Sequence, residues 1–173
     1  GELNLGSAAM PERGAGTLGT AEIKLDGELN ASNGDYTVGN VVQANTGGTI
    51  TADTGANLNT GEINVLAVTA DAANIKATGD VTAGDIDLVK GGSVTSDKDI
   101  NVNGIVGSIE DADGTLQAGG DIMVLNDITK AKDGKLTVVA GGTITADNIT
   151  ATNVVAKKLT ASGDVAVDGG VLN

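Results

Sequence analysis

The heptapeptide GGTITAD occurs at 47–53 and again at 141–147, and a close variant, GGSVTSD, occupies 91–97. The three copies contain no histidine, cysteine or lysine, and each has only one acidic residue, its final aspartate. A catalytic loop is normally needed once in a chain, whereas a structural unit is reused many times. The repetition therefore indicates a periodic scaffold.

A second repeated word consists of an acidic residue followed by aliphatic, polar and aliphatic residues. Its aliphatic positions include the pairs Ile63 and Val65, Ile86 and Leu88, Ile100 and Val102, and Val165 and Val167. Residues two apart in a strand point to the same side, so each pair is predicted to face a core. The words are short and open with Gly or a polar residue, which predicts many short strands separated by bends.

The C-terminal third shows how these strands follow one another. Aliphatic residues recur there at steps of five and then six, at Ile144, Ile149, Val154, Leu159, Val165 and Val171. Units this short cannot bury their aliphatic side alone, but stacked units form a continuous column. Abundant β-branched residues and glycines disfavour helices.

We therefore predict an all-β fold, a parallel β-solenoid with an aliphatic core. Three strands and their corners would use roughly 16–24 residues per turn, which allows about 7–9 turns. At about 4.8 Å per turn the rod would be roughly 35–45 Å long. The chain has no Phe or Trp, and its one Tyr is Tyr36. We expect a narrow coil to exclude aromatic rings and to be filled by Val, Ile, Leu and Ala.

The chain is expected to form one domain over 1–173, with 1–20 as an irregular start or insertion and 21–173 as the repeats. It could equally be a section of a longer chain. The heptapeptide copies lie 44 and 50 residues apart, which is not a whole number of equal turns. We expect longer corners at 71–74 and 107–114 to absorb the difference.

The composition excludes several functional classes. The formal net charge is −13, which repels the phosphates of nucleic acids and anionic lipids. The absence of Cys and His argues against zinc, haem and iron–sulfur sites. Uninterrupted apolar runs are too short to span a membrane. We expect no cofactor, no nucleic-acid partner and no membrane insertion.

Paired carboxylates are the main candidates for chemistry. They occur as Asp85 and Asp87, Asp97 and Asp99, and Asp111 and Asp113. Such pairs can act in acid–base catalysis, but the chain has no aromatic platform for a sugar ring, and its single arginine, Arg13, lies in the irregular start. We interpret the pairs as solvated corners and predict no enzyme, no catalytic residue and no metal ligand.

Calcium binding stays open as an alternative, because stacked turns can bring like carboxylates together. The β-roll calcium repeat GGxGxDxUx is absent, since Thr-Ile-Thr or Ser-Val-Thr follows the paired glycines. No ligands are assigned.

The segment AGGDIMVLNDITKAKDGKLTVVAGGTITADNITATNVVAKKLTASGDVAVDGG at 118–170 resembles the filamentous haemagglutinin repeats of bacterial two-partner secreted proteins and autotransporter passengers. The resemblance covers roughly 47–173. It implies a right-handed parallel β-helix exported to the cell surface. A second resemblance, of 143–173 to bactofilins, implies a cytosolic filament.

The expected function is that of a structural, non-enzymatic bacterial surface protein, extracellular in location, which forms a rod or filament by coil stacking and serves adhesion or assembly. Its expected partners are further copies joined end to end, neighbouring repeats of the same chain, or a host or cell-surface glycan or protein. The alternatives are a bactofilin-like cytoskeletal filament and a glycan- or calcium-binding β-helix module.

Overall fold

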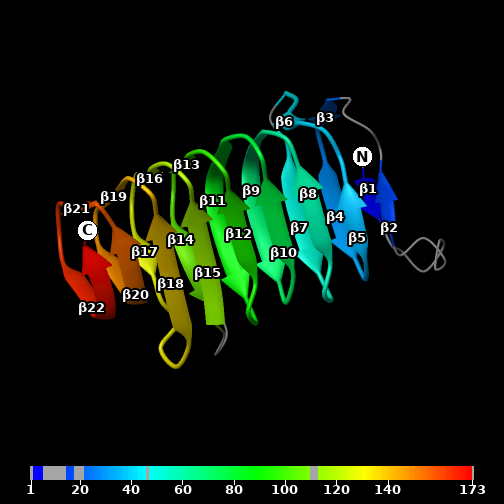
Figure 1. Ribbon diagram of the computed structural model, residues 1–173. Helices are drawn as coiled ribbons and strands as arrows, with labels where there is room; N and C mark the ends of the chain where they lie inside the picture. The colour runs from blue at the N-terminus through cyan, green and yellow to red at the C-terminus, as the bar shows by residue number, and fades with distance from the viewer. Residues whose placement is uncertain (1, 6–14, 18–21, 46, 110–112, 173) are drawn as a thin grey trace.

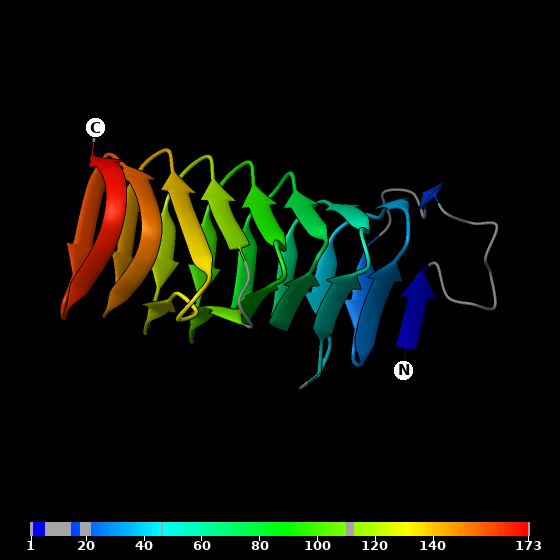
Figure 2. The same ribbon diagram turned by 90° about the horizontal axis from the view of Figure 1, so that it is seen from below.

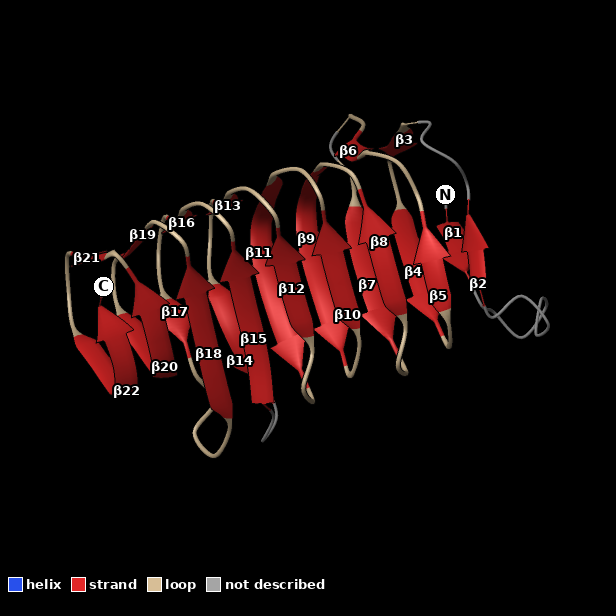
Figure 3. Ribbon diagram, in the orientation of Figure 1, coloured by secondary structure: helices blue, strands red, loops and turns tan. Residues whose placement is uncertain are grey.

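The computed structural model describes residues 2–5, 15–17, 22–45, 47–109 and 113–172. All regular structure in these ranges is β, with no helix (Figure 3). The chain winds into a solenoid, and the N- and C-terminal turns lie at opposite ends of the rod (Figures 1 and 2). Every strand pairing between successive turns is parallel.

Each turn contributes one strand to each of three faces, which follow in the order first, second, third. The first face contains β1 (Glu2–Leu5), β4 (Glu28–Ser32), β7 (Thr49–Asp53), the later parts of β9 (Ile63–Asp71) and β11 (Val81–Val89), β14 (Val106–Ile109), β17 (Ile128–Thr129) and the early parts of β20 (Ile149–Ala156) and β22 (Val165–Leu172).

The second face contains β2 (Ala15–Thr17), β5 (Asp35–Thr37), β8 (Asn57–Thr60), β10 (Asn74–Ala77), β12 (Ser93–Ser96), β15 (Asp113–Ala118), β18 (Lys135–Ala140) and the later parts of β20 and β22. The third face contains β3 (Ile23–Leu25), β6 (Val41–Gln43), the early parts of β9 and β11, β13 (Ile100–Val102), β16 (Ile122–Val124), β19 (Thr143–Ala146) and β21 (Lys158–Ala161).

Aliphatic side chains from successive turns lie in register. One column on the first face runs through Leu29, Ile50, Val68, Ile86, Val106, Ile128, Ile149 and Val165. These pairings define seven turns, with spacings from 16 residues (Ile149 to Val165) to 22 (Val106 to Ile128). At about 4.8 Å per turn this column spans roughly 35 Å. The predicted all-β parallel solenoid with an aliphatic core is confirmed.

Most predicted core pairs are buried, but the last turn differs. Ile63, Ile86 and Ile100 are fully buried, whereas Val165 remains 47% exposed although it stacks on Ile149. A rung is buried only when turns lie on both sides of it, and Val165 belongs to the outermost described turn. The next aliphatic residue of the spacing, Val171, pairs with the half-buried Val155.

Tyr36 contradicts the expectation that the coil excludes aromatic rings. Its side chain is 3% exposed and lies in the core, and its hydroxyl donates a hydrogen bond to the Ser32 carbonyl at 2.7 Å. Its register partners are Gly16 in the preceding turn and Leu58 in the next. A glycine partner leaves space for the ring, and the hydroxyl satisfies its polarity locally.

The three heptapeptide copies lie on three different faces. Copy 47–53 enters β7 of the first face, copy 91–97 enters β12 of the second, and copy 141–147 enters β19 of the third. Successive copies are therefore separated by two turns plus one face. This explains why neither separation is a whole number of turns. The second separation is the larger because its turns are longer, with 22 residues from Val94 to Leu116 against 18 from Ile50 to Val68.

The segment 71–74 is in fact a tight corner between the first and second faces. Non-glycine residues with positive φ occupy its position in four successive turns, at Asn33, Thr54, Ala72 and Lys90. Of the segment 107–114, positions 107–109 belong to β14 and 113–114 to β15, and 110–112 lie outside the described residues. Most of the irregular start predicted at 1–20 lies outside them too.

Candidate functional site

Carboxylates form a hydrogen-bonded column at the corner that precedes the third face. Asp80 Oδ1 accepts the backbone N–H of Asp99 at 3.1 Å, and Asp99 Oδ1 accepts that of Asp121 at 2.8 Å. Asp121 Oδ1 in turn accepts the N–H of Thr143 at 2.8 Å. Each carboxylate thus caps a backbone donor in the following turn, which is a structural use of the acidic residue.

The glycines at positions 120 and 142 follow from this column. A Cβ added at Gly120 would overlap Asp99 Oδ1, and one added at Gly142 would overlap Asp121 Oδ1. Only glycine leaves space for a carboxylate that reaches up from the turn below. The glycine before Asp121 is visible in the sequence, but the carboxylate for which it leaves space can be identified only from the register of the turns.

Among the predicted carboxylate pairs, Asp85 and Asp87 lie close enough for charge repulsion, whereas Asp97 and Asp99 have different surroundings. Asp97 is exposed, while its partner Asp99 belongs to the corner column. Asp85 Oδ1 accepts the N–H of Ile105 at 2.8 Å, and Asp111 lies outside the described residues. Desolvation by burial, followed by repulsion from Asp85, raises the pKa of Asp87 above its ordinary value of 3.8.

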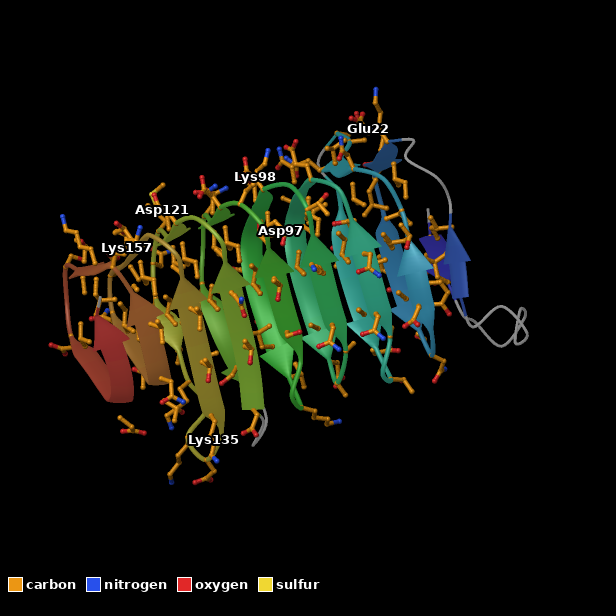
Figure 4. All side chains as sticks on the ribbon, in the orientation of Figure 1. Glu22, Asp97, Lys98, Asp121, Lys135 and Lys157 are labelled. Atoms are coloured by element: carbon orange, nitrogen blue, oxygen red, sulfur yellow. The ribbon has the colours of Figure 1, made fainter. Side chains whose placement is uncertain are left out.

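The edge formed by this corner carries mixed charge. Glu22, Lys98, Asp121 and Lys157 lie along it, one at each of four corners (Figure 4). Within the described ranges, no group of three or more acidic, histidine or cysteine side chains is arranged to hold a metal ion.

A polar hollow of about 510 Å³ lies on the second face over β5, β8, β10 and β12. It is lined by Asp35, Asn57, Asn59, Asn74, Ile75, Lys76, Ser93 and Thr95. Their place in the sequence alone does not mark these residues as one group. The alternation in NLN (57–59), NIK (74–76) and SVT (93–95) predicts strands with one polar side. That these polar residues share one column depends on the turn lengths.

Four of these side chains form a directed ladder of three hydrogen bonds. Ser93 Oγ donates to Asn74 Oδ1 at 2.5 Å, Asn74 Nδ2 donates to Asn57 Oδ1 at 3.0 Å, and Asn57 Nδ2 donates to Asp35 Oδ1 at 2.6 Å. The ladder links four successive turns, so its side chains are held in place by their hydrogen bonds to one another.

A second hollow, of about 260 Å³, lies where the third face meets the corner to the first. It lies against Met123, Leu125, Thr145 and Thr160. Met123 is 54% exposed and Leu125 64% exposed. This surface is more apolar than the second-face hollow.

No protein-family model, curated protein or solved structure matches this chain. Across the described ranges, no helix has the length and apolar character needed to cross a membrane. The parallel stacked strands show that the fold is that of a β-solenoid repeat protein. No match assigns it to a particular family.

Proposed function

We propose that this protein is a non-enzymatic structural rod of the filamentous haemagglutinin-like type, which extends by stacking of solenoid turns and serves adhesion or assembly at a bacterial cell surface. The single observation that carries this is the uninterrupted in-register column from Leu29 to Val165. A column of this kind couples every turn to its neighbours and resists bending and extension along the axis.

Continuous backbone pairing supports the mechanical part of the proposal. Parallel pairings link each turn to the next on all three faces. Buried Thr60, Ser96 and Ser108 each make a hydrogen bond to the backbone. Among the described residues, no buried side-chain polar atom lacks a partner. In these ranges the rod is therefore not weakened by unpaired buried side chains.

The outermost described turns support the stacking part. The aliphatic residues that pack on the core while staying partly exposed belong to these turns, and they are Leu3, Leu5 and Ile23 at one end and Leu159, Ala161 and Val167 at the other. Apolar rungs with unpaired strand groups are templates for further pairing. Another turn of the same chain or a second copy would cover them.

Electron microscopy and fibre diffraction of the purified chain test this proposal. We expect fibres with a meridional repeat near 4.8 Å, because stacking places the solenoid axis along the fibre. Val165→Lys should abolish fibres by placing a charge in the stacking surface. Leu125→Lys removes a similar apolar side chain from the outer surface and should leave fibres intact. Discrete short rods from the unmodified chain would contradict end-to-end stacking.

The surface location is tested separately from assembly. Protease treatment of intact source cells should degrade the protein if it is displayed outside, whereas a bactofilin-like cytosolic filament would be protected. Protection in intact cells, followed by degradation after lysis, would favour that alternative.

A further inference from the structure

We propose that the second-face hollow over β5, β8, β10 and β12 is a binding site for a neutral, hydroxyl-rich ligand, of the class of uncharged oligosaccharides. The inference adds a ligand class to one face of the rod. It rests on the solenoid fold and not on end-to-end assembly, so a short monomeric rod that binds would leave it standing. The four strands lie side by side along the rod (Figure 1).

The first column of the hollow is ordered in advance. The ladder from Ser93 through Asn74 and Asn57 to Asp35 uses one N–H of each amide and one oxygen of Asp35. Each amide keeps a second N–H, and Asp35 keeps its second carboxylate oxygen. Side chains that are already fixed lose less conformational entropy when they bind a ligand.

A second column lies beside the first, two residues along each strand. It consists of Thr37, Asn59, Lys76 and Thr95, in register across the same four turns. Strands about 4.8 Å apart, with same-side residues roughly 6.5 Å apart along each strand, place donors and acceptors on a two-dimensional grid. A sugar hydroxyl both donates and accepts a hydrogen bond, so it can use either kind of group on the grid.

Charge selects an uncharged ligand. Asp35 and Lys76 are the only charged residues of the hollow, and their charges are opposite. The hollow is therefore neutral, whereas the whole chain carries −13. The net negative charge of the protein repels acidic ligands. Basic ligands gain little, because the hollow has no excess of carboxylates to attract them.

An extended peptide fits this hollow less well than an oligosaccharide does. Strand addition needs free backbone N–H and C=O groups, and the inner strands β8 and β10 pair with strands on both sides. The hollow also has no apolar pocket for an anchoring side chain, since seven of its eight lining residues are polar or charged.

The same polar column continues beyond the hollow. Ser93 is in register with Thr115, Thr115 with Thr137, and Thr137 with Asn153. Without an aromatic platform each contact is weak, so binding through hydrogen bonds alone should strengthen with ligand length as more rungs are engaged.

Titrations followed by ¹H–¹⁵N NMR test the proposal, with cellohexaose and maltohexaose as neutral probes, glucose as the short probe and hexagalacturonate as the acidic one. We expect saturable shifts of the side-chain amides of Asn57, Asn59 and Asn74 with a neutral hexasaccharide. The amides of Asn101 on the third face and Asn126 at a corner should stay unchanged. Glucose should bind at least about tenfold more weakly, since it reaches fewer rungs.

The double variant Asn59→Ala/Thr95→Ala should weaken binding roughly tenfold through the loss of two hydrogen-bonding groups, while Asn101→Ala/Thr145→Ala should bind as the unmodified chain does. Thr95→Glu keeps every ladder bond and should also weaken binding, should the double variant fold poorly. No saturable shift with either neutral hexasaccharide up to about 50 mM, tighter binding of hexagalacturonate, or unchanged binding by Thr95→Glu would overturn the proposal.

Discussion

Asp121 Oδ1 occupies the space that a side chain at Gly142 would need, and from there it accepts the N–H of Thr143 at 2.8 Å. One acidic residue thus sets the identity of a glycine 21 positions later. The same relationship joins Asp99 to Gly120 in the preceding turn. Each of these aspartates is therefore coupled to a glycine in the next turn, and substitutions at the two positions of a pair should be coupled too.

Gly142→Ala is expected to destabilise the solenoid by about 2 kcal/mol, because the new methyl group overlaps the Asp121 carboxylate. In an Asp121→Ala background the same change should cost at least about 1 kcal/mol less. Chemical denaturation of the four proteins of this double-mutant cycle measures the coupling. Gly107→Ala is the control, since the nearest atom to its Cβ would be Asp87 Oδ1 at 3.9 Å. Additive losses would show that the carboxylate does not determine the glycine.

Thr54→Asn is expected to stabilise the protein by about 0.5–1 kcal/mol. Thr54 has a φ of 50°, which is costly for a β-branched residue, and asparagine adopts this left-handed conformation more readily. Asn33 already occupies the equivalent corner with a φ of 56°. The melting temperature measures the gain. Thr51→Asn, in the adjacent strand β7, should not stabilise, and equal gains at both positions would contradict the conformational explanation.

Ile100→Ala is expected to cost about 2–5 kcal/mol, because Ile100 is fully buried between Val81 and Ile122 in neighbouring turns. Leu125→Ala, at a residue 64% exposed, should change stability by about 0.5 kcal/mol or less. Denaturant titration of both variants makes the comparison. Similar losses would mean that the aliphatic column is not the core that holds the turns together.

Asp87→Asn is expected to raise stability at pH 7 by a few tenths of a kcal/mol, because solvent screens part of the effect at this half-buried position. Burial, then Asp85, raises the pKa of Asp87, so the folded state binds this proton more tightly than the unfolded state does. Protonation therefore stabilises the fold, and this contribution is lost as the pH rises through the raised pKa.

The advantage of Asp87→Asn over the unmodified chain should accordingly shrink as the pH falls from 7 through the raised pKa toward the ordinary value of 3.8. Unfolding free energies measured across this range give the profile. Asp133→Asn, at an exposed loop residue, serves as control. An advantage that grows on acidification would reverse the sign and contradict the burial of Asp87.

The sequence by itself determined the class of fold. Period-two alternation at residues such as Ile86 and Leu88 specifies a strand with one buried side, because side chains alternate across a strand. Strands this short can bury that side only by stacking, so repeated words separated by glycines and polar corners predict a solenoid. The absence of cysteine and histidine likewise argues against zinc, haem and iron–sulfur sites from the sequence alone.

The tertiary structure alone decided which residues share a column. Turn lengths vary between 16 and 22 residues across the seven turns from Leu29 to Val165, so equal spacing in the chain does not mean equal position in space. For this reason the three heptapeptides lie on three faces, Gly142 lies over Asp121, and Asn57, Asn74 and Ser93 form one ladder. Register is set by packing between turns and corner geometry, which act between residues far apart in the chain.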